Sequence, residues 1–341
     1  MDSQVLAHLE RIEHLVQALA RLPWLGAEEL DSIRATLLDF DAGHWAIVRI
    51  LSLPLYQELT ALLESGEATQ LLPERPRLAV VMPVYGARRD LLHQALTSLR
   101  RQVGVGIEAW ISIDGRQEDR DLVEAVIASL EATSEAAPWQ LTLLDSDRNR
   151  GVGLCRNRAL QQITAPYFTC LDADDVFHPL RCLHGLLLLQ REGLMRLNTG
   201  WCRASLLEKK IIVINDRLAH VGHTSFLARS ELLTQYGYQA GLRFYEDTEF
   251  MQRHRFFGVP MRDTPVVAYY AHSEPRDDYV STATVGRVEV HAIKDHPYLC
   301  GSVIAEPPQN WLEIKLHFDQ LYPCLSASDL PAAFPACPAL P

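Results

Sequence analysis

Apolar residues recur at three- and four-residue steps through the first 64 residues, which is the spacing of one face of an α-helix. Three such stripes follow one another, over residues 6–19, 30–38 and 45–63. The first two are separated by a break at Pro23–Gly26, and Pro54 should kink or restart the third helix. The pattern predicts a helical region over residues 1–70. Its apolar face either packs within the chain or offers a docking surface to a partner or a second copy.

After a proline-containing linker at residues 71–76, short apolar strands alternate with segments of helical spacing. This alternation is typical of a parallel sheet covered by helices on both faces. Residues 326–341 form a Pro/Ala-rich tail that need not be ordered. Strands are predicted at 78–84, 107–113, 139–144, 166–171, 211–214 and 266–270, and helices at 90–102, 122–130, 152–163, 180–190, 229–236, 246–257 and 310–321.

Composition excludes several classes of protein. The net charge of −11 argues against a nucleic-acid partner, because affinity for a phosphate backbone comes from Lys and Arg. Seven cysteines without a Cys-x-x-Cys pair fit a reducing compartment and give no zinc signature. The charged N-terminus is unlike a signal peptide, and the apolar runs are too short to span a bilayer. We therefore expect a soluble, cytoplasmic protein, with peripheral membrane attachment left open.

An apolar run that ends in three carboxylates, residues 167–175, has the strongest chemical character in the chain. A buried strand would deliver Asp172 and Asp174 to its carboxyl end, where ligands bind in open α/β sheets. Two oxygen ligands on one side of a strand suit a divalent cation that carries a phosphate. The alternative is a loop whose aspartates cap the next helix, with Asp175 or His178 at the cap.

Five motifs occur in an order and spacing typical of one enzyme family. They are Val81–Gly86, with its Pro-Val-Tyr turn, Ile111–Gly115, Asn149–Asn157, the Asp-x-Asp within Asp172–Asp175, and Tyr245–Asp247. Together they resemble the family 2 glycosyltransferases, which have the GT-A fold, over roughly residues 77–279. Two departures from the family pattern are Gly86, where asparagine is usual, and Asp114, which stands alone where two acids are usual.

The resemblance implies roles for individual residues in binding a nucleotide-sugar donor. Asp114 would read the base, although it could also be only a turn residue before Gly115. Arg156 would neutralise the diphosphate or contact the base, although a solvated helix face is its alternative. Asp172 would hold the sugar hydroxyls and Asp174 would ligate Mg²⁺ or Mn²⁺. The remaining positions are Pro83, Val84 and Tyr85, in the family's opening turn at the donor, and His272, at a third metal-ligand position.

The last motif implies the catalytic base. Transfer to an acceptor requires that its hydroxyl lose a proton, which a carboxylate within hydrogen-bond reach can accept. The family places this role, with inversion at the anomeric carbon, on Asp247, and Glu246 is the second candidate. Two acids that open a helix are also a common capping pattern, because the helix dipole favours negative charge there.

These observations predict an α/β protein with a GT-A, Rossmann-like sheet and an all-helical N-terminal appendage. The expected regions are residues 1–70, the glycosyltransferase domain 77–281 and a C-terminal extension 282–341. We expect an inverting, metal-assisted hexosyltransferase that uses a UDP-sugar and an acceptor that is a glycan, lipid, small molecule or protein. One alternative is a sugar-phosphate nucleotidyltransferase, although its glycine-rich, lysine-containing start is absent. The other is an inactive glycosyltransferase-like scaffold, although Asp174 and Asp247 are both present.

Overall fold

The N-terminal region folds into helices in the computed structural model, which describes residues 3–43, 46–133, 139–205, 210–212, 217–242, 245–272 and 311–336. Pro54 lies inside α3, so the expectation that the helix restarts there is wrong, while the kink stays a prediction. An interior proline costs about 3 kcal/mol, and the neighbouring Leu55 and Leu59, both at 0% exposure, offset this by their burial. The helices are α1 (Ser3–Leu19), α2 (Ala27–Gly43), α3 (Ala46–Glu64) and α4 (Ala68–Leu71).

The first half of the sheet has the predicted alternation of parallel strands and helices. Its strands lie in the order β3-β2-β1-β4, and every neighbouring pair is parallel. Their carboxyl ends therefore meet at one edge, which is where ligands bind in such sheets. The elements are β1 (Arg77–Val84), α5 (Arg89–Arg100), β2 (Gly106–Ile113), α6 (Gln117–Thr133), β3 (Gln140–Asp145), α7 (Val152–Leu160) and β4 (Tyr167–Cys170).

The second half of the sheet is mixed, so the expectation of a parallel sheet is wrong there. Strand β8 pairs antiparallel with β4 and β6, while β6 pairs parallel with β9. The predictions missed β6 and β8 because their sequences are rich in polar residues and lack an apolar run. The elements are β5 (Val176–Phe177), α8 (Arg181–Arg191), β6 (Arg196–Ser205), β7 (Lys210–Ile212), β8 (His220–Arg229) and β9 (Met261–His272). Residues 213 and 214 of one predicted strand lie outside the described residues.

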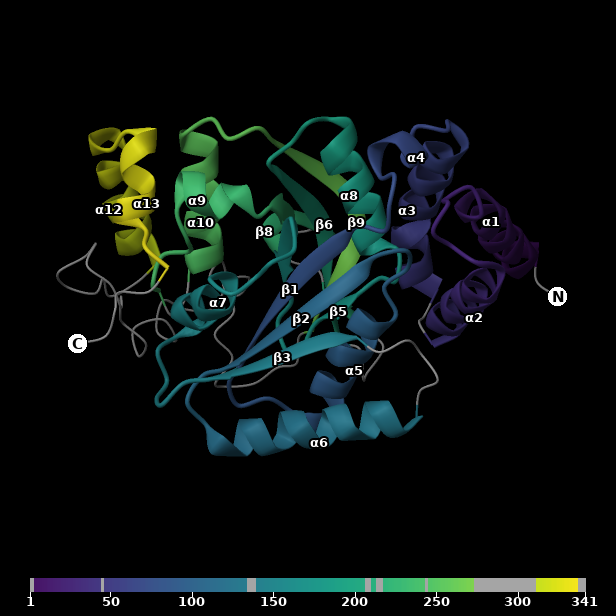
Figure 1. Ribbon diagram of the computed structural model, residues 1–341, viewed down its shortest axis with the longest axis horizontal. Helices are drawn as coiled ribbons and strands as arrows, with labels where there is room; N and C mark the ends of the chain where they lie inside the picture. Colours follow the sequence, from purple (N-terminus) through teal and green to yellow (C-terminus); the bar gives the residue numbers. More distant parts are fainter. Residues whose placement is uncertain are drawn as a thin grey trace.

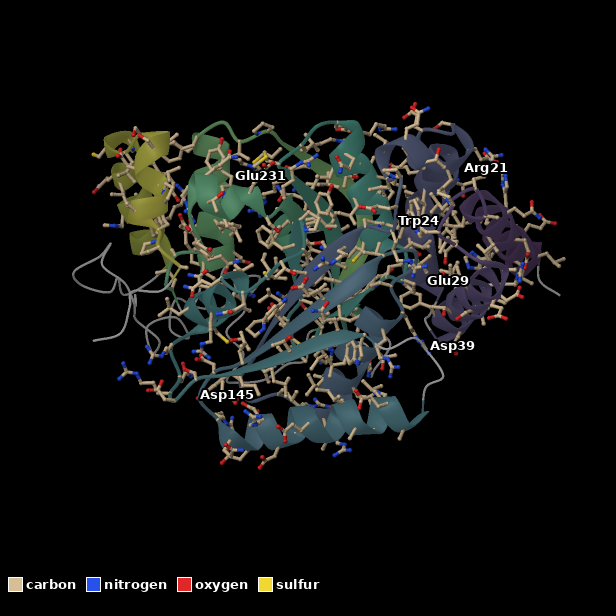
Figure 2. All side chains as sticks on the ribbon, viewed as in Figure 1. Arg21, Trp24, Glu29, Asp39, Asp145 and Glu231 are labelled. Atoms are coloured by element: carbon tan, nitrogen blue, oxygen red, sulfur yellow. The ribbon has the colours of Figure 1, made fainter. Side chains whose placement is uncertain are left out.

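The N-terminal helices share one hydrophobic core with the sheet. The rings of Phe40 and Tyr56 lie 4.7 and 5.5 Å from that of His178, between β5 and α8. In the linker, Arg75 donates hydrogen bonds to the Trp24 carbonyl oxygen and to the Glu29 carboxylate. Figure 2 labels these two partners, Trp24 and Glu29, in the N-terminal helical region. Apart from Leu6, which is exposed, the apolar stripes of the described helices are thus packed faces. Docking of a partner through this region, and the domain boundaries, stay predictions.

The C-terminal segment, which we define as residues 311–336, packs against α9 (Glu231–Tyr236) and α10 (Glu246–Phe256). It consists of α12 (Trp311–Leu321), two 3₁₀ turns and α13 (Leu330–Ala333). Figure 1 shows α12 and α13 beside α9 and α10, on the side of the molecule opposite to α1 and α2. The expected loose tail is therefore wrong for residues 326–336, because Leu330 and Phe334 are buried. In the described part of the chain, no helix combines the length and apolarity needed to cross a bilayer.

Candidate active site

Three predicted donor-binding residues follow neighbouring strands at one edge of the sheet. Strand β1 lies between β2 and β4 and runs parallel to both. Tyr85 follows β1, Asp114 follows β2, and Asp172 lies two residues beyond β4. The structure thus brings together side chains that are up to 87 positions apart, and it does so at the edge where α/β sheets bind ligands.

The turn after β1 presents one aromatic ring to solvent. Pro83 is half-buried, and Val84 is fully buried. Its carbonyl oxygen accepts a hydrogen bond of 2.9 Å from the Asp114 N–H. Tyr85 is 57% exposed, and the Arg116 guanidinium lies 5.4 Å from its ring centre. A ring exposed in this way offers a flat surface on which a nucleotide base could stack.

Asp119, which the sequence analysis missed, holds this turn in place. It is buried on α6, where its two carboxylate oxygens accept hydrogen bonds from the backbone N–H groups of Gly86, at 2.7 Å, and Ala87, at 3.2 Å. In the sequence it is one of two acids in the first turn of a helix. Such pairs usually serve the helix dipole, so no local signal distinguishes Asp119 from Glu118.

Asp114 does more than form a turn before Gly115. Its carboxylate is buried and accepts hydrogen bonds from the backbone N–H groups of Arg150, at 2.7 Å, and Gly151, at 2.9 Å. It thereby ties the end of β2 to the loop that starts α7. Each carboxylate oxygen has a second lone pair, so the group can still accept a hydrogen bond from a base.

The acidic segment, which we define as residues 172–175, is hydrogen-bonded to the end of β9. Asp175 accepts hydrogen bonds from the Tyr269 hydroxyl, at 2.5 Å, and from the backbone N–H of His272, at 2.7 Å. Burial, together with the nearby Asp174 and Asp172, raises the pKa of Asp175 well above its ordinary value. The helix that follows begins only at Arg181, and its N-cap position is taken by another residue. The expectation that Asp175 or His178 caps this helix is therefore wrong.

Arg156 joins two acids that lie on different sides of the site. Its guanidinium donates to Asp172 Oδ1 at 2.5 Å and forms a second ion pair with Glu246. At 2% exposure it is not on a solvated helix face, so that alternative is wrong. The guanidinium has five N–H donors, so the two Nη groups retain donors beyond those that bind these carboxylates. Its predicted contact with the donor remains a prediction.

The first turn of α10 carries both candidate bases in different environments. Glu246 is buried, and this burial raises its pKa to about 7, although Arg156 opposes the shift. Asp247 is half-buried, and its Oδ1 accepts a hydrogen bond of 2.6 Å from the Thr248 N–H. Tyr245, which precedes the pair, has a φ of 70°, a conformation that L-residues other than Asn and Asp rarely adopt. Asp247 is thus the more accessible of the two carboxylates.

Helix α7 supports the chain that leads to these acids. The Gly153 N–H donates to the Leu242 carbonyl oxygen at 3.0 Å, and a Cβ on Gly153 would lie 2.3 Å from the Ala240 carbonyl oxygen. The fully buried Asn157 donates to the Gln239 carbonyl oxygen and accepts from its N–H. The motif at residues 149–157 therefore fixes the position of residues 239–242.

The metal-ligand predictions can be compared with the donor atoms available. Within the described ranges, no group of three His, Cys, Asp or Glu side chains is arranged to hold a metal ion. Asp174 is half-buried, and His272 is 2% exposed next to Asp175. The Asp174 carboxylate suits a cation that takes most of its ligands from a bound diphosphate and water, as Mg²⁺ does, whereas the His272 imidazole is a less natural ligand for Mg²⁺.

Comparison with known proteins gives one family match. Residues 79–200 match the model of glycosyl transferase family 2, and this range runs from the third residue of β1 through β4 and the acidic segment. No curated protein matches the sequence.

Solved structures of S. aureus TarS are similar to part of the chain. TarS 1–349 in complex with UDP-GlcNAc is 18% identical and covers 60% of this chain and 62% of its own, with a TM-score of 0.47. TarS 1–349 in complex with UDP is also 18% identical, covers 58% of this chain and 61% of its own, and has a TM-score of 0.44. The match therefore spans about three fifths of the length of these structures.

Proposed function

We propose that the chain is a glycosyltransferase that transfers a sugar from a UDP-sugar to an acceptor hydroxyl with inversion, a proposal supported by the match of residues 79–200 to the model of glycosyl transferase family 2. The observation that supports this best is the pair of salt bridges made by Arg156. They join Asp172, after β4, to the first turn of α10, which carries Asp247. A donor bound at the strand ends would therefore lie beside a carboxylate that can accept a proton.

Asp247 is the proposed general base. Glu246 is buried and engaged by Arg156, which holds it away from an incoming acceptor. Asp247 is partly exposed at the start of the same helix, so an acceptor hydroxyl can reach it. General-base assistance of this kind is typically worth 10²–10⁴-fold in rate. Glu246 then serves to anchor the turn rather than to accept the proton.

The proposed reaction is a single displacement at the anomeric carbon. The acceptor hydroxyl gives its proton to the Asp247 carboxylate while its oxygen forms a bond to that carbon. On the opposite face, the bond between the anomeric carbon and the diphosphate oxygen breaks, and UDP leaves with the bonding electron pair. Attack opposite to the leaving group inverts the configuration of the sugar.

Donor binding is assigned to the strand-end residues. Tyr85 would stack on the base, Asp114 would accept its imide N–H, and Asp172 would hold the ribose hydroxyls. Asp174, with His272 as a second candidate, would hold Mn²⁺ or Mg²⁺ on the diphosphate, and this ion would stabilise the negative charge on the leaving group. These assignments agree with the half-buried position of Asp174 and the exposed ring of Tyr85.

A donor screen tests the proposal. Release of the sugar from UDP-, GDP- and other nucleotide sugars is measured with Mn²⁺ or with a chelator, and we expect turnover of a UDP-sugar that depends on the metal. UDP at a hundredfold its dissociation constant should add about 2.7 kcal/mol of stability. The same shift in melting temperature with chelator would refute the metal role, and turnover of only non-uridine donors would refute the UDP assignment.

A further inference from the structure

One hydroxyl of the C-terminal segment, that of Tyr322, contacts α10, the helix that carries Asp247. Tyr322 is 2% exposed, and its OH donates to Glu249 Oε1 at 3.0 Å. The same OH lies 3.3 Å from the Glu249 carbonyl oxygen. Glu249 also forms an ion pair of 2.8 Å with Arg253, and both side chains are fully buried. Tyr322 thus completes a buried polar network on the face of α10 that points toward the C-terminal segment.

Phe334, also in the C-terminal segment, packs against Arg253 of this network. Its ring centre lies 3.6 Å from the Arg253 guanidinium, and its carbonyl oxygen accepts a hydrogen bond of 2.9 Å from the Tyr238 N–H. Arg253 in turn donates to the carbonyl oxygens of Tyr236 and Tyr238. A Cβ on Gly237 would lie 2.8 Å from the Leu330 carbonyl oxygen, so the two backbones approach closely. The contact is too close and too specific for a loosely attached tail.

This contact continues to the residue that precedes the two acids. Tyr245 is 4% exposed and belongs to one hydrophobic cluster with Phe318, Tyr322 and Phe334. Its carbonyl oxygen accepts the first helical hydrogen bond of α10, from the Glu249 N–H, at 2.8 Å. A non-glycine residue at positive φ is unfavourable and persists only where its surroundings fix it. The C-terminal segment supplies part of those surroundings.

We propose that the C-terminal segment positions the first turn of α10 for transfer, with Tyr322 as a positioning residue that acts through Asp247. This inference rests on the proposed function, because it requires that Asp247 accept the proton. Small displacements of a catalytic group cost large factors in rate, so the loss of one buried hydrogen bond to this helix should reduce turnover. Binding of UDP should not change, because the donor residues lie at the strand ends.

The test is Tyr322→Phe, which keeps the ring and removes only the hydroxyl. We expect the transfer rate at saturating donor to fall by about tenfold, with UDP affinity and binding stoichiometry unchanged. Leu316→Ala is the matched control, since Leu316 lies on the same helix α12 and is 49% exposed. Its rate should equal that of the wild type. An equal loss of rate in the control, or none in Tyr322→Phe, overturns the inference.

A double-mutant cycle separates positioning from a general loss of structure. If Tyr322 acts through Asp247, then Tyr322→Phe should change the residual rate of Asp247→Asn by less than about twofold, because groups that act as one unit are not additive. A tenfold loss in both backgrounds would overturn the inference. Asp247→Asn with normal turnover refutes instead the proposed base. Should Tyr322→Phe not bind UDP, Phe334→Leu is measured in the same way and decides the question.

Discussion

The proposed site has two sides that are built differently, a donor side at the ends of β1, β2 and β4 and an acceptor side at the first turn of α10. On the donor side, Asp114 is held by backbone N–H groups of the neighbouring loop, and the turn after β1 is held by Asp119 in the same manner. On the acceptor side, the first turn of α10 is held by the side chains of Arg156 and Tyr322. Backbone contacts follow from the local fold of the sheet, whereas these side-chain contacts depend on distant segments.

This difference predicts that UDP affinity and turnover respond to substitutions in different parts of the site. Changes on the donor side should alter UDP affinity and leave turnover at saturating donor largely intact. Changes on the acceptor side should alter turnover and leave UDP affinity intact. Helix α7 contacts both sides of the proposed site. Its Arg156 forms ion pairs with Asp172 and Glu246, and its Gly153 and Asn157 contact residues 239–242.

The largest effect on stability is expected at α7, which contacts both sides of the proposed site. In Gly153→Ala, the new Cβ would meet the Ala240 carbonyl oxygen at 2.3 Å, and neither backbone can move without breaking contacts. We expect a loss of about 3 kcal/mol in unfolding free energy, measured by denaturant unfolding, with a larger loss of turnover than of UDP affinity. Gly26→Ala is the control, because nothing lies within 4 Å of its Cβ. Equal stability of the two variants would contradict the account.

A smaller effect is expected from the pH dependence of Glu246. Burial raises its pKa from 4.5 to about 7 in the folded protein, so the folded state keeps a proton that the unfolded state has released. The contribution of Glu246 to the unfolding free energy therefore falls as pH rises from about 4.5 to about 7 and is constant above that range. Relative to Glu246→Gln, the wild type should lose on the order of 2 kcal/mol between pH 4.5 and pH 8.

Unfolding in urea at both pH values checks this expectation. Glu124→Gln, at an exposed position of α6, is the control for the replacement of a glutamate by glutamine. If the wild type and Glu246→Gln keep the same difference in stability at both pH values, then Glu246 does not titrate as its burial implies.

The smallest effect is expected on the donor side, at Asp119. In Asp119→Asn, the N–H groups of Gly86 and Ala87 lose a charged acceptor, and the turn that carries Tyr85 loosens. A hydrogen bond of this kind contributes about 1 kcal/mol, so UDP affinity should fall about fivefold in a titration, with turnover at saturating donor unchanged. The neighbouring Glu118→Gln, at an exposed position, should bind UDP normally. A fall in turnover without a change in affinity would reverse the assignment of this turn.

The sequence predicted the parts of the fold that have local patterns. Strands β1 to β4 are apolar runs between helical segments, and each predicted bound lies within a few residues of the structure. Strands β6 and β8 were missed because residues such as Arg196, Asn198 and His220 interrupt any apolar pattern. Arg196 and Asn198 are nonetheless fully buried, because they bind each other and also His254 and Asp263. The latter two partners are 58 and 65 residues away in the sequence, so no local pattern reveals them.

The same limit applies to the site. The acids at the strand ends and at the start of α10 were predicted, because short motifs mark them. The burial of Arg156 was not, since its partner Glu246 is 90 residues away in the sequence. Tyr322 is 73 residues from Glu249 and lies next to a Pro/Ala-rich stretch that resembles a tail. Contacts of this range become visible only when the fold brings the segments together.

The central claim is that the donor is bound at the strand ends while Asp247 accepts the proton. The most direct test is to measure the transfer rate and the UDP affinity on one preparation of Asp247→Asn, with saturating donor and Mn²⁺. We predict a fall in rate of about 10²–10⁴-fold, with UDP affinity within about twofold of the wild type, because the base faces the acceptor rather than the diphosphate. A normal rate, or a loss of UDP affinity as large as the loss of rate, would contradict the account.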